Sequence, residues 1–114
     1  MQLDTLFLLK PGFYDGDRGP FVNAECTKIV GYLSLYPQVA TAIAVRQIPF
    51  RRPRGELVAL LGEANQGCPV LVLSDAARTP AVELAKVGNG RRFIDSANDI
   101  LSYLGTAYRA PVPH

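Results

Sequence analysis

Three short apolar runs in this chain are each bounded by proline and are separated by helical patterns. "TLFLLK" is closed by Pro11 and "TAIAVRQI" is stopped by Pro49, so both are typical of short strands, the first buried on both faces. A third run predicts a strand over Val70–Leu73. Because a helical pattern separates the first two runs, a right-handed crossover and a parallel strand pair are favoured.

The first helical pattern begins at "NAEC", where the side-chain oxygen of Asn23 can accept a backbone N–H of the first turn. Pro37 ends this helix. Its apolar residues recur at spacings of three and four, as a buried stripe requires. They are Cys26, Ile29, Val30, Leu33 and Tyr36.

A second helix is predicted between the second and third strands. Pro53 and Glu56 suit its first turn, and Gly62 closes it. Its inward-facing residues are Leu57, Leu60 and Leu61.

The pattern weakens after the third strand. Turn signals surround residues 74–90, so we expect a loop there with a short helix around Val82 to Val87. "RRFI" then predicts a fourth strand, and Ser96 caps a last helix with Asp99 three residues on. The apolar stripe of that helix comprises Ile100, Leu101, Leu104 and Tyr108.

Composition and charge limit the class of protein. The 114 residues, 48% hydrophobic and 19% charged, predict a single domain over 1–114 rather than a disordered chain. No apolar run approaches the ~20 residues of a membrane span, and the start of the chain lacks the features of a signal peptide. We therefore expect a cytoplasmic protein whose two cysteines are free thiols.

The order βαβαββα, with "GCPVLVL" at the third strand and "DSANDILSYL" as the closing helix, resembles the thioredoxin-like fold, and most closely its glutaredoxin and glutathione-transferase N-terminal branch. "TLFLLKPGF" and "RRFIDSANDILSYL" look like an uncharacterised bacterial domain-of-unknown-function family of that clan. The resemblance covers nearly the whole chain. It implies an α/β fold with a four-stranded mixed sheet flanked by helices.

Redox members of the clan begin the first helix with a Cys-x-x-Cys pair, whose first thiol attacks and whose second resolves the mixed disulfide. That motif falls on Asn23-Ala24-Glu25-Cys26. An amide cannot form a mixed disulfide, so the motif is degenerate. For Cys26 itself, packing in the core is favoured over reactivity.

The resemblance also implies a cis bond between Cys68 and Pro69, with Cys68 facing the first helix and offering its backbone to a peptide or thiol. The alternative is that Cys68 replaces a small apolar residue. Two thiols meeting at one end of the fold raise the hypothesis that Cys26 and Cys68 can pair, which requires Cα atoms within roughly 7 Å.

Asp95 and Ser96 stand where glutathione transferases hold the γ-glutamyl end of glutathione, although capping alone explains Ser96. The long segment 11–22 is expected to be a loop over the site, where Phe13, Tyr14 and Arg18 line it or form a lid.

Other kinds of site find little support. The cluster of Arg46, Arg51, Arg52 and Arg54 lacks interleaved aromatic residues, so a solvated edge or a partner contact is favoured over nucleic acid. Two cysteines and the single terminal His114 do not suggest a metal site.

The sequence therefore favours a binding or interaction module with a degenerate redox site. Its predicted ligand-binding residues are Asn23, Cys68, Pro69, Asp95 and Ser96. The expected partner is a thiol peptide or another protein, with a homodimer left open and no cofactor except glutathione as a candidate ligand. The alternative is a thiol oxidoreductase or glutathione-dependent enzyme using Cys26, Cys68 or both.

Overall fold

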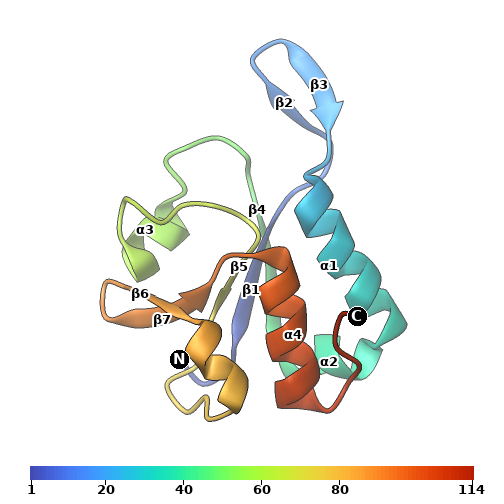
Figure 1. The fold of residues 1–114 in the computed structure, drawn as a ribbon. Coiled ribbons are helices and arrows are strands. Elements are labelled where there is room, and N and C mark those ends of the chain that lie inside the picture. The colour runs from blue at the N-terminus through green and yellow to red at the C-terminus, as the bar shows by residue number, and fades with distance from the viewer.

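The computed structural model describes residues 1–114 and has an α/β architecture built on a mixed five-stranded sheet, in the order β4-β1-β5-β7-β6 (Figure 1). The strands are β1 (Thr5–Leu9), β4 (Ala44–Ile48), β5 (Val70–Val72), β6 (Lys86–Gly88) and β7 (Arg91–Ile94). Strands β1 and β4 are parallel, and the other neighbours are antiparallel. The predicted α/β class and parallel pair are confirmed.

The prediction of four strands is wrong, because β6 adds a fifth at the edge of the sheet. A short helix was expected around Val82 to Val87. The structure has a 3-10 helix, η1 (Pro80–Leu84), in the first part of this region, and β6 begins at Lys86. Asn89 and Gly90 have φ angles of 51° and 74° and join β6 to β7. Asn-Gly with two positive φ values is the preferred two-residue hairpin turn, so this signal was present in the sequence.

Helices cover both faces of the sheet (Figure 1). They are α1 (Ala24–Leu35), α2 (Pro37–Ala42), α3 (Gly55–Leu61) and α4 (Ala97–Tyr108). Helices α1, α2 and α4 contact one another on one face, whereas α3 contacts β6. The longest of them has 12 residues, so none has the length or apolarity to cross a bilayer.

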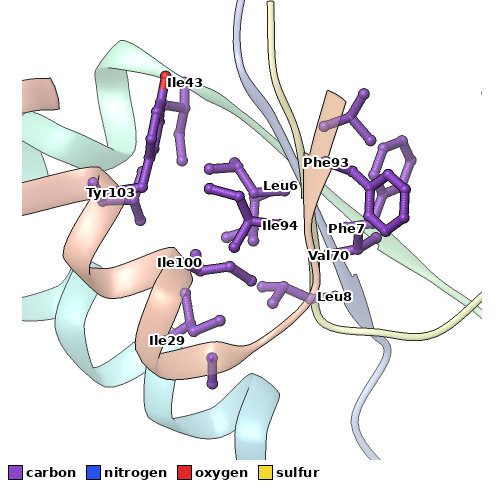
Figure 2. Close-up of a cluster of buried hydrophobic side chains, with 14 of the residues drawn as sticks. Leu6, Phe7, Leu8, Ile29, Ile43, Val70, Phe93, Ile94, Ile100 and Tyr103 are labelled. Atoms are coloured by element: carbon purple, nitrogen blue, oxygen red, sulfur yellow. The ribbon is translucent and has the colours of Figure 1, made fainter. Parts of the chain in front are cut away.

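Strand β1 is the centre of the core, since all five of its residues are buried. Leu6 and Leu8 point toward Ile29 and Ile100 of α1 and α4, while Phe7 points to the opposite side of the sheet (Figure 2). This alternation follows from the two-residue period of a strand. The expected burial on both faces is confirmed.

Several predicted element boundaries shift. Strand β4 begins at Ala44 rather than at the start of "TAIAVRQI", because α2 extends to Ala42. Pro37 ends α1 as predicted and also starts α2. Pro53 lies before α3 rather than in its first turn. In α1, Val30 is exposed because only Cys26, Ile29 and Leu33 reach the core.

The predicted loop at 11–22 is instead a hairpin of β2 (Phe13–Asp15) and β3 (Arg18–Phe21), which projects from the end of the sheet (Figure 1). The Phe13 ring stacks on the Phe50 ring at 4.4 Å between centroids. This stack ties the base of the hairpin to the segment that follows β4.

The opposite end of the sheet is held by Asp4, which is 3% exposed. Its carboxylate accepts hydrogen bonds from the Ser74 N–H, the Tyr103 hydroxyl and the Tyr108 hydroxyl, each at 2.7 Å. Two donors from α4 and one from the segment after β5 thus fix α4 to the sheet. We call this cluster the aspartate end.

Candidate functional site

Cys26 and Cys68 approach the same end of the sheet from different elements. Cys26 lies in the first turn of α1, where the Asn23 side chain accepts the Cys26 N–H at 2.9 Å, so the predicted cap is confirmed. Cys68 lies just before β5 and is half-buried. Both are free thiols.

Burial holds the Cys26 thiol in its neutral form. Its side chain belongs to the core, with 4% exposure. This burial raises the pKa of Cys26, while a backbone hydrogen bond at Leu9 and the charge of Arg54 offset part of the effect. A buried thiol with a raised pKa is a poor nucleophile at neutral pH.

Burial also raises the pKa of Cys68, to about 11. The nearby Arg54 charge lowers this pKa but does not overcome the desolvation. Neither cysteine therefore forms a thiolate readily at pH 7.

The backbone at Cys68 is open. The Cys68–Pro69 peptide bond is cis, as are the Gly19–Pro20 and Arg52–Pro53 bonds. Ladder pairing of β5 with β1 starts only at Val70, and neither the N–H nor the C=O of Cys68 makes a backbone hydrogen bond. These two groups are therefore available to a ligand.

Arg54 is only 8% exposed, and nothing in the sequence distinguishes it from the other arginines of its cluster. Its Nε and Nη2 donate to the Phe50 carbonyl at 3.0 and 2.6 Å, and its Nη1 donates to the Gln66 carbonyl at 2.7 Å. No carboxylate pairs with it. The only sequence signal is that residues 46–54 contain four arginines and no acid.

Gln66 is the second residue that the sequence did not indicate. Its Oε1 accepts the Arg54 backbone N–H at 2.7 Å, and its Nε2 donates to the Glu63 carbonyl at 2.9 Å. Gln66 thereby joins the segment before α3 to the segment before Cys68. Together Arg54 and Gln66 make this end of the sheet rigid.

Three of the four clustered arginines border a cavity of about 690 Å³, the arginine cavity. Its walls include Tyr14, Asp15, Phe50, Arg51, Arg52 and Arg54. Arg46 is different, because it forms a two-fold hydrogen-bonded ion pair with Glu56 at 2.6 Å. The expectation of a solvated edge fits Arg51 and Arg52, which are exposed, but is wrong for Arg54, which is buried.

The hairpin contributes unevenly to this region. Tyr14 lines the arginine cavity, which includes neither cysteine, whereas Phe13 and Arg18 line none of the cavities. A smaller apolar cavity of about 150 Å³ lies between the base of the hairpin and α1, where Val22, Cys26 and Val30 contribute to its walls.

Asp95 and Ser96 precede α4. Ser96 accepts the Asp99 N–H at 3.5 Å, which confirms the predicted cap. Asp95 pairs with Lys86 at 3.1 Å and lines a cavity of about 260 Å³ together with Arg52 and Gly67. The cavity connects Asp95 to the segment before Cys68, while Asn23 and Ser96 are already engaged as caps. No group of three or more metal-binding side chains gathers in the protein.

Comparison with known sequences identifies one family. The sequence model described as "Protein of unknown function (DUF3088)" matches residues 3–112. Neither the curated proteins nor the solved structures give a significant match.

Proposed function

Since the chain belongs to the DUF3088 family of proteins of unknown function, we propose a function from its own geometry: it is a thioredoxin-like binding module with a degenerate redox site. The module holds an extended thiol peptide, or a segment of a partner protein, along the backbone at Cys68. No covalent step is part of this function.

The strand order supports the thioredoxin-like assignment. Strands β4-β1-β5-β7 form a four-stranded unit in which only β1 and β4 are parallel, and α1 lies between these two strands in the chain. Helix α4 follows β7 directly. In this assignment β6 is an added edge strand, and the β2–β3 hairpin is an insertion before α1.

The observation that carries the proposal is the unpaired backbone of Cys68, which neither donates nor accepts a backbone hydrogen bond. An extended ligand that pairs with this N–H and C=O adds a short strand to the protein, and such main-chain pairing is a general mode of peptide recognition. Unpaired backbone groups on a half-buried residue favour such a ligand, since each unmade hydrogen bond has a cost.

The neutral thiols explain why binding is favoured over catalysis. The pKa of Cys68 is raised to about 11 by burial, and that of Cys26 is raised as well. Asn23 stands where an attacking thiol is needed and is occupied as a helix cap. An oxidoreductase or a glutathione-dependent enzyme that uses either cysteine lacks an activated thiolate here.

Asp95 gives the ligand a second contact. It lines a cavity with Gly67, the residue before Cys68. In the proposed complex the ligand follows Cys68 and Pro69 and places an amino group near the Asp95 carboxylate. Glutathione, which is an extended thiol peptide with such an amino group, is the candidate ligand.

The test is a titration of the reduced protein with S-methylglutathione, whose sulfur is blocked, followed through the backbone amide signals. We expect the signals of Gly67 and Cys68 to shift saturably, and reduced glutathione to bind with the same affinity. Cys68→Ser keeps the backbone, so it should bind as the wild type does, whereas Asp95→Asn should bind more weakly.

Thiol reactivity distinguishes the binding proposal from the enzymatic alternative. An alkylating probe that modifies Cys26 or Cys68 well below pH ~8.5, the ordinary thiol value, would contradict the binding proposal. So would a mixed disulfide with glutathione that forms in the wild type and is lost in Cys68→Ser. Absence of any shift at Gly67 and Cys68 would also contradict it.

A further inference from the structure

The arginine cavity carries more positive charge than the protein neutralises. Arg51, Arg52 and Arg54 line it, and none of them has a carboxylate partner among the ion pairs. Asp15 is the only acid on its walls. Three positive charges and one negative charge leave a net of +2 in one cavity.

Arg54 supplies a donor that is already fixed in position. A guanidinium has five N–H groups, and Arg54 uses one on each nitrogen for the Phe50 and Gln66 carbonyls. Each of its two terminal nitrogens therefore keeps one N–H. Because the side chain is 8% exposed and held at three points, a ligand would bind it without ordering it first.

The burial of the Arg54 charge also has a cost, which its hydrogen bonds to neutral carbonyls offset only in part. Buried charges are normally paired, because desolvation disfavours the charged form. Burial lowers the pKa of the Arg54 guanidinium, and the charge of Arg52 lowers it further, although the nearby Cys68 opposes this. The positive charge of Arg52 therefore adds to the cost of burying the Arg54 charge.

We propose that the arginine cavity binds the phosphate group of a small organic phosphate monoester, with Arg54 as the fixed donor. A phosphate monoester carries about −1.5 to −2 charges at pH 7, which matches the cavity, whereas a single carboxylate would leave half of the charge unpaired. Arginine forks also match phosphate oxygens bidentately.

The organic part of the ligand lies toward Tyr14. The cavity of about 690 Å³ exceeds the space that a bare phosphate needs and is within the usual range for a small-molecule site. Tyr14 is 58% exposed on its wall, so its ring is free to stack. By contrast, Phe50 is covered by Phe13 on one side and lies 5.5 Å from the Arg54 guanidinium.

This site goes beyond peptide docking at Cys68 and does not depend on it. The test uses phenyl phosphate, inorganic phosphate and benzoate as probes at constant ionic strength, followed through backbone amide signals and thermal unfolding. We expect phenyl phosphate to bind saturably, with shifts at residues 14–16 and 50–54, and to raise the unfolding temperature by linkage. Inorganic phosphate should bind more weakly, and benzoate weakest.

Variants assign the binding to this cavity. The double variant Arg51→Gln/Arg52→Gln changes only exposed side chains and should weaken phenyl phosphate binding about tenfold. Arg54→Lys keeps the charge but loses the fork, and a similar loss is expected. Tyr14→Ala should weaken phenyl phosphate but not inorganic phosphate. The matched control is Arg78→Gln, which removes an arginine from a different cavity.

Several outcomes would overturn the proposal: no saturable shift at residues 14–16 and 50–54, benzoate binding as tightly as phenyl phosphate, or Arg78→Gln weakening binding as much as the double variant. If Arg54→Lys does not fold, the double variant still decides the question. If the wild-type protein binds S-methylglutathione but not phenyl phosphate, the phosphate site is refuted and the peptide site at Cys68 is not.

Discussion

The two ends of the sheet each bury one charged side chain, but they treat it differently. At the aspartate end, Asp4 is 3% exposed and accepts three hydrogen bonds from protein donors. At the other end, Arg54 is 8% exposed, donates to backbone carbonyls and keeps two N–H groups. The first charge is fully engaged within the fold, and the second is only partly engaged.

The surroundings of the two charges follow the same division. The Asp4 carboxylate accepts hydrogen bonds from Ser74, Tyr103 and Tyr108, so no oxygen of this carboxylate is left without a protein donor. Around Arg54, the backbone of Cys68 is unpaired and further arginines line a cavity. The comparison teaches that a buried charge is enclosed by hydrogen-bond donors at one end of the sheet, whereas at the other end it lines the cavity for which we propose a ligand.

Removal of the carboxylate in Asp4→Ala should have the largest effect. Tyr103, Tyr108 and the Ser74 N–H would lose their acceptor, and we expect the free energy of unfolding to fall by roughly 3–5 kcal/mol. That is a large fraction of an ordinary domain's stability of about 5–15 kcal/mol. Urea unfolding measures it.

The matched control for Asp4 is Asp75, an exposed aspartate that pairs with the N-terminal amine at 2.8 Å. Asp75→Ala should change the unfolding midpoint far less. Equal losses in the two variants would show that the aspartate end is not the structural clamp described above.

Arg54→Met should have the next largest effect. It leaves the Phe50 and Gln66 carbonyls without their donor, at a cost of about 1–3 kcal/mol. The loss is smaller than for Asp4 because the substitution also removes a buried charge that has no ionic partner. The control Arg52→Met, at an exposed site, should leave stability nearly unchanged in the same urea experiment. A loss for Arg54→Met as large as that for Asp4→Ala would remove the distinction between the two ends.

The C-terminal tail packs against α4 at Gly105 and accepts a hydrogen bond from Tyr32 of α1. The substitution Gly105→Ala tests this packing. A Cβ at this position would lie 2.7 Å from both the Pro111 carbonyl and a Val112 methyl. We expect a loss of about 1–2 kcal/mol from overpacking, with the tail displaced. Its hydrogen bond with the Tyr32 hydroxyl, 2.8 Å long, should be lost as well.

A second glycine provides the control for Gly105. In Gly31→Ala, the new Cβ on α1 meets no atom within 4 Å. This change should leave stability unchanged or raise it by up to about 1 kcal/mol, since alanine favours helix. Thermal unfolding of both variants, with the Tyr32 signals as a probe of the tail, decides whether the tail is a packed part of the fold.

The sequence predicted local features well, because their causes lie within a few residues. The buried strand at Thr5–Leu9 and the caps Asn23 and Ser96 are confirmed. The hairpin at Asn89 and Gly90 was equally local, and it was missed because its flanking strands are short and partly exposed.

The two charged ends could not be predicted in the same way. Asp4 meets Tyr103 and Tyr108 across 99 and 104 residues of sequence. The Arg54 guanidinium donates to the nearby Phe50 carbonyl and also to the Gln66 carbonyl, twelve residues away. In both cases the fold brings a distant partner, so neither pattern nor propensity indicates it. The sequence therefore indicated the two cysteines as candidate residues and gave no such indication for the buried Arg54.

Alkaline pH should lower the free energy of unfolding in two steps, one from each end of the sheet. Burial raises the pKa of Cys68 to about 11, so the unfolded chain loses this proton first, near pH ~8.5. The free energy of unfolding should therefore fall as pH rises from there toward 11.

The tyrosines at the aspartate end lose their protons at higher pH than the Cys68 thiol of the unfolded chain. Burial and the hydrogen bond to Asp4 raise the pKa values of Tyr103 and Tyr108, so their contribution is lost only above the ordinary tyrosine value of about 10. Urea midpoints measured across this range should show a first decline that Cys68→Ala reduces, with the remainder due to Cys26, and a second decline that it leaves unchanged. If Cys68→Ala leaves the first decline intact, the Cys68 thiol is not held neutral by the fold, and the end that contains Arg54 is more solvated than its burial indicates.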